Sequence, residues 1–147
     1  MFQRILAAYD GSDVARHALR EAIQLANEQQ AQLRIVSVVD LGPLFWVPVA
    51  RFDVADVEKA VIQQAENDLA DAAAMARQAG TAPETVLRRA NGRRVSDEII
   101  AEATSWPADL IVMGTHGRGG VERLVLGSVA ERVARAAPVP LLLVRGH

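Results

Sequence analysis

The chain has 147 residues, of which 50% are hydrophobic, a formal net charge of -2 and no cysteine, so disulfides, thiolate catalysis and the common structural zinc sites are excluded. No apolar run approaches the roughly 18 to 20 residues that a membrane span needs, and the slightly acidic balance argues against nucleic-acid binding as the main task. We therefore expect a single domain over residues 1–147, with no membrane span and no nucleic-acid partner.

The first predicted strand covers residues 2–9, "FQRILAAY", a short apolar run that Asp10 ends. Ser12 can cap the next helix, which we expect to extend to about Gln30, because small and aliphatic residues recur on one face at a spacing of 3.6 residues. A second strand over residues 33–39 is rich in β-branched side chains. The N-terminal run lacks a small-residue cleavage signal, so we expect a cytoplasmic protein.

The middle of the chain predicts a loop, a helix and a weaker strand. Prolines and a glycine punctuate the loop, whose Phe45 and Trp46 fit a cover for the core or a partner surface better than stacking on a ligand. A long amphipathic helix follows from Val54 to about Ala79. The strand over residues 83–90 carries several charges, so we expect it at an edge of the sheet.

The last third predicts two helices and two strands. The fourth strand, residues 108–114, is apolar on both faces, as expected of a strand that helices cover on both sides. Ser128 followed by Glu131 matches a capping box and predicts Ser128 as the N-cap of the last helix. An apolar fifth strand covers residues 138–145. The third helix, within residues 91–106, is expected to turn four residues inward: Val95, Ile99, Ile100 and Ala103.

Strands and helices alternate along the whole chain, which predicts an α/β fold. We expect an open, five-stranded parallel sheet of the doubly wound, Rossmann-like kind, in the order 3-2-1-4-5, with helices on both faces. Strands 1 and 4 are then neighbours, and ligands bind beyond the carboxyl ends of the strands at such a point. Those two ends are Asp10 and Gly114.

A glycine-rich segment begins at this point of the fold. Residues 113–128, "MGTHGRGGVERLVLGS", contain five glycines. Glycines let backbone amides converge on an anion, and the following helix adds further amides and a positive dipole end, so the segment favours a phosphate ligand. It is not a P-loop, because no lysine precedes Ser128, and the dinucleotide fingerprint is absent after the first strand, which reads "DGSD".

The spacing of Gly114, two residues, Gly117, nine residues, Gly127 and Ser128 resembles the ATP-binding motif of the universal stress protein family. The resemblance extends along the chain: "RILAAYDGSDVARHALREAIQLA" is similar to the opening of that family, and "GTHGRGGVERLVLGSVAERVARAAPVPLLLV" to its closing half. It implies a fold of the adenine nucleotide alpha hydrolase kind.

The resemblance to the ATP-binding subgroup implies a role for nine residues. Asp10 would lie by the adenosine, and the backbone of Val38 would bind adenine. Met113 and Gly114 would line the ribose side. The ligand would be ATP, ADP or AMP, with Mg or Mn held through the phosphates. The phosphates would be surrounded by Gly117, Arg118, Gly127, Ser128 and Val129.

Several of these residues have a structural alternative. Asp10 could merely cap the first helix together with Ser12, and Ser128 could serve only its own helix. Arg118 could be a solvated loop residue rather than a phosphate ligand. We expect His116 to be a loop residue rather than a catalyst, because the neighbouring sequence offers it no acid or nucleophile.

The resemblance implies an ATP-binding sensor or regulatory protein of the stress response. It would act as a homodimer paired through the last strand, from Val139 to Val144, and would contact a further protein. No general base is evident, so hydrolysis of ATP would be slow at most. One alternative is a module of the same family that binds no nucleotide and acts through protein contacts. Another is an adenylate-transferring enzyme, although the "SGGxDS"-like loop of such enzymes is missing after the first strand.

Overall fold

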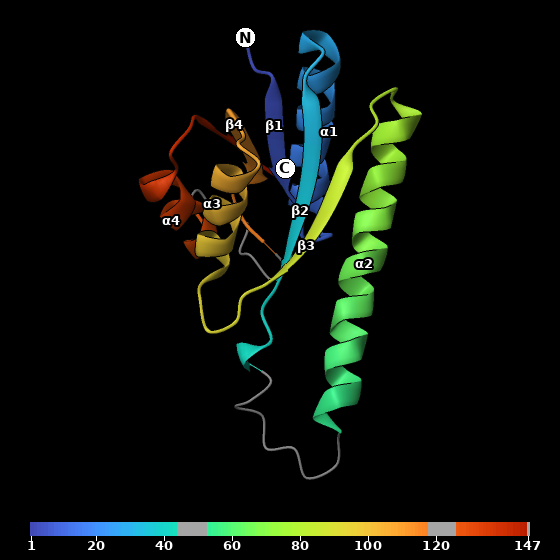
Figure 1. Ribbon diagram of the computed structural model, residues 1–147, viewed down its shortest axis with the longest axis vertical. Helices are drawn as coiled ribbons and strands as arrows, with labels where there is room; N and C mark the ends of the chain where they lie inside the picture. Colours follow the sequence, from blue (N-terminus) through green and yellow to red (C-terminus); the bar gives the residue numbers. More distant parts are fainter. Residues whose placement is uncertain (44–52, 118–125, 147) are drawn as a thin grey trace.

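A five-stranded parallel sheet forms the centre of the structure (Figure 1). The computed structural model describes residues 1–43, 53–117 and 126–146. The strands lie in the order β3-β2-β1-β4-β5, which confirms the predicted order. The charged strand β3 is at one edge, also as predicted, and β5 is at the other. The bounds are β1 Arg4–Ala8, β2 Gln32–Val39, β3 Glu84–Arg89, β4 Leu110–Gly114 and β5 Leu141–Val144.

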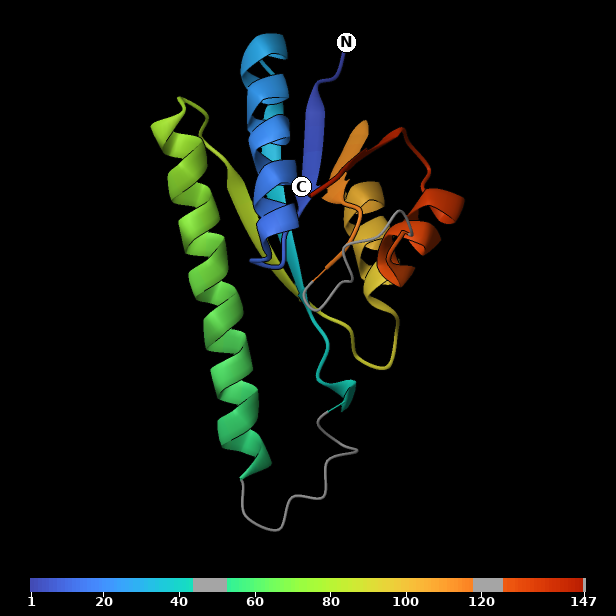
Figure 2. The ribbon, with the colours of Figure 1, turned by 180° about the vertical axis from the view of Figure 1, so that it is seen from behind.

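Two helices cover each face of the sheet (Figures 1 and 2). Helices α1 and α2 pack on one face, and α3 and α4 on the other, so the doubly wound α/β fold is confirmed. Each parallel connection carries its helix, as such sheets require. The bounds are α1 Asp13–Gln29, α2 Val54–Gln78, α3 Val95–Ser105 and α4 Ser128–Ala136.

The core has two halves because the central strands are buried on both faces. On β1, Ile5 packs toward α1 and α2, whereas its neighbour Leu6 packs toward α3 and α4, and both side chains are fully buried. Leu33 lies opposite Ile5 on β2, and Leu110 lies opposite it on β4. Burial of both strand faces explains why these segments read as nearly continuous apolar runs.

Helix α2 is longer than the sheet that it covers. Its 25 residues span about 37 Å, and its N-terminal half extends past the end of the strands (Figure 1). Its buried residues lie from the middle of the helix onward, between Ala65 and Ala76. Val54, in the first turn, is 37% exposed. The apolar core therefore packs on the C-terminal half of α2, while the first turns are linked to β3 by the Glu58–Arg89 ion pair (3.5 Å).

Helix α3 corrects one prediction about the core. Val95, Ile99 and Ala103 pack in the core as predicted, whereas Ile100 is half-buried and is not among the residues that pack there. Glu98 and Glu102 are buried on the inner face instead. The carboxylates turn inward because arginines on β2 and β3 meet them there. The inner face of α3 is therefore partly ionic.

Candidate functional site

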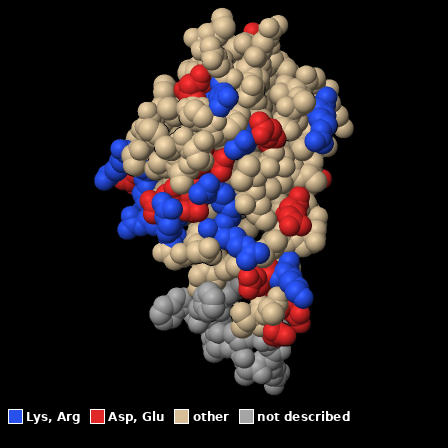
Figure 3. All heavy atoms as spheres, viewed as in Figure 1, with Lys and Arg blue, Asp and Glu red and all other residues tan. Residues whose placement is uncertain are grey.

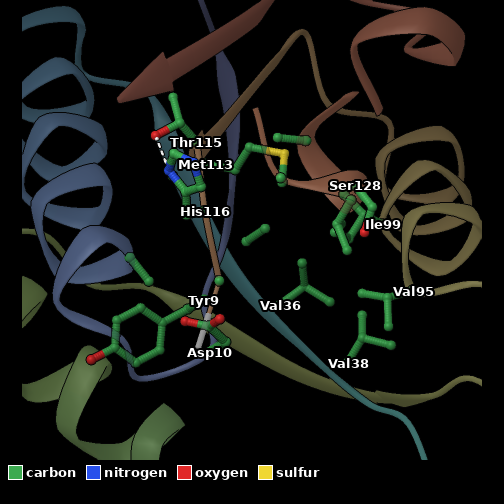
Figure 4. A pocket seen from close by; sticks show the side chains of 17 residues that line it. Tyr9, Asp10, Val36, Val38, Val95, Ile99, Met113, Thr115, His116 and Ser128 are labelled. Atoms are coloured by element: carbon green, nitrogen blue, oxygen red, sulfur yellow. Dashed lines mark hydrogen bonds between the residues drawn. The ribbon is translucent and has the colours of Figure 1, made fainter. Parts of the chain in front are cut away.

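A cavity of about 330 Å³ opens at the carboxyl ends of β1 and β4 (Figure 4). These are the neighbouring strands at which the connections of a doubly wound sheet diverge, and ligands bind there in this class of fold. Residues from β1, β2, β4, α3 and the start of α4 contribute to the lining. The topology thus places the cavity where the sequence predicted a ligand.

One side of the cavity is apolar. Val36 and Val38 come from β2, and Val95 and Ile99 come from α3; the four side chains gather together in Figure 4. Met113, at the end of β4, adds a thioether. A flat, weakly polar group such as a nucleobase would lose little hydration by entering between these side chains, and apolar walls with a few polar groups are usual in ligand pockets.

The other side of the cavity is formed by glycines. A β-carbon added to Gly117 would lie 2.9 Å from Asp10 Oδ2, and one added to Gly127 would lie 3.1 Å from the Thr115 carbonyl oxygen. The positive φ angles of the described glycines are at Gly11, Gly80 and Gly92, outside this segment. The described glycines of the site are therefore needed for close approach rather than for an unusual backbone conformation.

The first turn of α4 faces the cavity without a side-chain cap. Gly127 is the N-cap residue: its carbonyl accepts the Glu131 N–H at 3.0 Å, and its own N–H donates to the Thr115 carbonyl at 2.8 Å. The predicted capping box at Ser128 is therefore wrong, because Ser128 is already the first helical residue. Glycine has no side chain to accept the first-turn amides, and no other side chain in the described part of the chain accepts them, so an anion from outside the helix could bind there.

Asp10 combines a structural contact with a place in the cavity lining. Its Oδ1 accepts the Ser12 N–H at 2.9 Å, and the Ser12 hydroxyl accepts the Ala15 N–H at 3.1 Å as the N-cap of α1. The expected contribution of Asp10 to the start of α1 is therefore present. The carboxylate also lies next to Gly117, across the cavity from the apolar side (Figure 4).

The structure brings eight of the nine predicted binding residues to this one cavity. They come from three separate parts of the chain: the end of β1, strand β2, and the connection from β4 to α4. Arg118, the ninth, lies outside the described residues, as do Phe45 and Trp46. The eight are Asp10, Val38, Met113, Gly114, Gly117, Gly127, Ser128 and Val129.

Other lining residues were not predicted for the site. Val95 and Ile99 were assigned to the core from their helical spacing, and no sequence signal separates a core residue from one at a cavity wall. Thr115 and His116 lie inside the glycine segment, and the Thr115 hydroxyl is 3.0 Å from His116 Nδ1. The predictions for the site thus missed mainly the contribution of α3.

Residues 1–43, 53–117 and 126–146 contain no group of three His, Cys, Asp or Glu side chains placed to hold a metal ion. Asp10 is the single carboxylate among the described lining residues. In the same ranges, no helix is long and apolar enough to cross a membrane.

Comparison with known proteins gives matches over nearly the whole chain. The sequence matches the model of the universal stress protein family over residues 1–145. A universal stress protein of Methanocaldococcus jannaschii is 34% identical over 145 residues, which cover 99% of this chain and 83% of that protein.

Two similar solved structures contain adenine nucleotides. One is a universal stress protein in complex with cAMP, with 27% identity, a TM-score of 0.70 and coverage of 97% of this chain and 96% of that chain. The other is the universal stress protein from Archaeoglobus fulgidus in complex with dAMP, with 25% identity, a TM-score of 0.68 and coverage of 98% of both chains.

Proposed function

The chain belongs to the universal stress protein family, and on this premise we propose that it binds ATP, ADP or AMP in the cavity at the ends of β1 and β4. Binding would make it a nucleotide sensor or regulatory protein of the stress response. Two neighbours of the same fold hold cAMP and dAMP, which supports an adenine nucleotide as the ligand class.

The observation that carries this proposal is the division of the cavity into two unlike sides. The apolar side, with Val36, Val38, Val95 and Ile99, suits a base. The glycines, together with the first turn of α4, whose amides no described side chain caps, suit phosphates. A ligand with an apolar ring at one end and an anion at the other fits both sides together.

Within this proposal five of the predicted residues are each assigned a contact. Asp10 would accept a hydrogen bond from a ribose hydroxyl, and the backbone of Val38 would bind the adenine edge. The amides at Gly127, Ser128 and Val129 would hold the phosphates. A divalent cation, Mg or Mn, would be held mainly by the phosphates, because the described lining offers only the carboxylate of Asp10. With so few acid or base groups, hydrolysis of ATP would be slow at most.

The test is to identify what the purified protein carries and what it binds. The protein is purified without added nucleotide and denatured, and the released molecules are identified by mass spectrometry. The control is the double variant Gly117→Val, Gly127→Val, checked for folding by circular dichroism. We expect stoichiometric adenine nucleotide from the wild type and none from the folded variant. If the wild type releases none, and ATP with magnesium gives no calorimetric signal, nucleotide binding is refuted and a module acting through protein contacts takes its place.

We further propose a homodimer that pairs through β5, with contacts from Val139 to Val144. Strand β5 lies at the edge of the sheet, and all four of its residues, Leu141–Val144, are only partly buried. An apolar edge strand is prone to aggregate unless another strand covers it, and a two-fold pairing closes that edge on itself. Light scattering at micromolar concentration should give twice the mass of the chain; the mass of a single chain would refute the dimer.

A further inference from the structure

A chain of alternating charges connects α3 to the edge of the sheet. Glu102 carries an arginine on each oxygen: Arg34 Nη1 lies 2.6 Å from Oε2, and Arg88 Nη1 lies 2.8 Å from Oε1. Arg88 Nε also lies 3.3 Å from Glu98 Oε1. We call Arg34, Arg88, Glu98 and Glu102 the ion cluster. Basic and acidic side chains accordingly alternate on this face of the molecule (Figure 3).

The ion cluster is buried at its acidic end. The side chains of Glu98 and Glu102 are 8% and 5% exposed. Burial lowers the pKa of the Arg34 and Arg88 guanidinium groups, but hydrogen bonds and charge interactions with their glutamate partners, Glu102 first among them, outweigh it and hold the pKa of both above the ordinary arginine value. Ion pairs that are withdrawn from water are directional, so they tolerate displacement of α3 less well than apolar contacts do.

The far end of α3 is fixed to the same sheet. Trp106 is the C-cap residue and is buried, and its ring centre lies 4.8 Å from the Arg34 guanidinium carbon and 5.8 Å from that of Arg4. Arg4 also donates a hydrogen bond to the Trp106 carbonyl oxygen. Arginines that project from the sheet therefore hold the helix both along its length and at its C-terminal end.

The ion cluster and the apolar side of the cavity share two elements. Glu98 and Glu102 alternate along α3 with the lining residues Val95 and Ile99. On the sheet, Arg88 lies opposite Val38 in the register of β3 with β2. No member of the ion cluster is among the described residues that line the cavity. The cluster thus lies next to the apolar wall: three of its members are on β2 and α3, which build the wall, and Arg88 is on the neighbouring strand β3.

We propose that the ion cluster positions α3 so that Val95 and Ile99 form the wall against which the base of the nucleotide packs. This inference rests on the proposed nucleotide binding. Its four members are positioning residues: they do not touch the ligand, but they determine how tightly the cavity binds the base of the nucleotide. Apolar contacts alone would allow α3 to shift along the sheet, whereas a carboxylate of α3 that pairs with two arginines of the sheet fixes the helix in one position.

The test replaces Glu102 by Gln, which keeps the shape of the side chain but removes the charge that both arginines share. ATP affinity is measured by calorimetry at a temperature at which circular dichroism shows the variant folded. We expect a loss of roughly five- to tenfold. The matched control is Glu58→Gln, which breaks the exposed Glu58–Arg89 pair between α2 and β3 (3.5 Å), away from the cavity, and should leave the affinity unchanged.

A double-mutant cycle separates positioning from general stabilisation. If the ion cluster acts through the wall, Glu102→Gln should weaken ATP binding much less in an Ile99→Ala background than in the wild type. If the losses of ATP affinity caused by Glu102→Gln and Ile99→Ala simply multiply in the double variant, the two residues act independently and the proposal is overturned. An unchanged ATP affinity in folded Glu102→Gln would overturn it as well. If that variant does not fold, Arg88→Lys replaces it in the same cycle, with an expected loss of roughly two- to threefold. A wild type that binds no ATP would refute the proposed function itself, which is a different result.

Discussion

Two helices begin at the same end of the sheet, after the neighbouring strands β1 and β4, and their first turns differ. Helix α1 is capped by neighbouring side chains: the Ser12 hydroxyl accepts the Ala15 N–H, and the Asp10 carboxylate accepts the Ser12 N–H. Helix α4 begins at Gly127, which offers no side-chain acceptor. Side chains of the protein cap one helix end, while no described side chain caps the other, and the proposed phosphate site lies at that second end.

The largest expected effect comes from giving α4 the kind of cap that α1 has. Gly127→Asp would place a carboxylate on the first-turn amides of α4, and repulsion between this charge and a phosphate should weaken ATP binding by roughly a hundredfold or more. Calorimetric titration with ATP measures the effect. Gly127→Ala adds the same β-carbon, 3.1 Å from the Thr115 carbonyl oxygen, without the charge, and should cost much less affinity. Equal affinities for wild type and Gly127→Asp would show that phosphates do not bind at α4.

A smaller effect is expected at Asp10, which supports the start of α1 and also lines the cavity. Asp10→Ala removes the acceptor of the Ser12 N–H and the proposed ribose contact, so ATP affinity should fall roughly tenfold and the thermal midpoint should fall as well. Asp10→Asn keeps an acceptor oxygen for Ser12 and should restore the midpoint more fully than the affinity. If both variants bind ATP as the wild type does, Asp10 serves α1 alone.

The smallest effect is expected at the cap of α1 itself. Ser12→Ala removes the hydrogen bond to the Ala15 N–H and should reduce the free energy of unfolding by about 1 kcal/mol. For a chain of this length that lowers the thermal midpoint by about 2 to 4 °C. The ATP affinity, measured on the folded variant, should not change. A clear loss of affinity would mean that the two helix ends do not act independently.

Most of the fold followed from hydrophobic periodicity, because strands buried on both faces are short, continuous apolar runs and their helices have one apolar stripe. The edge position of β3 followed from its charge. The error at Ser128 has a local cause: the capping pattern fits Ser128 and Glu131, but the helical hydrogen bonds begin one residue earlier, where the Gly127 carbonyl accepts the Glu131 N–H. The spacing of a capping box cannot decide which of two adjacent residues is the N-cap when both are suitable.

The inner face of α3 could not have been predicted in the same way. Arg34 and Glu102 are separated by 68 positions in the sequence, so their pairing depends on the sheet order rather than on any local pattern. Two glutamates on a helix normally indicate a solvent-exposed face. The glycine side of the cavity could be predicted from the sequence, because its residues lie in one segment. A larger residue at these positions would come too close to neighbouring atoms, so glycines mark the site.

The uneven support of α2 has a consequence for its local motion. Its C-terminal half packs on the sheet, whereas its N-terminal half extends beyond the strands, and no residue of α2 before Ala65 is fully buried. Local opening of a helix requires less free energy where fewer buried contacts break. Backbone amides near Val57 should therefore exchange with deuterium much faster than those near Ala72, and α2 would unwind from its first turn while the rest of the molecule stays folded.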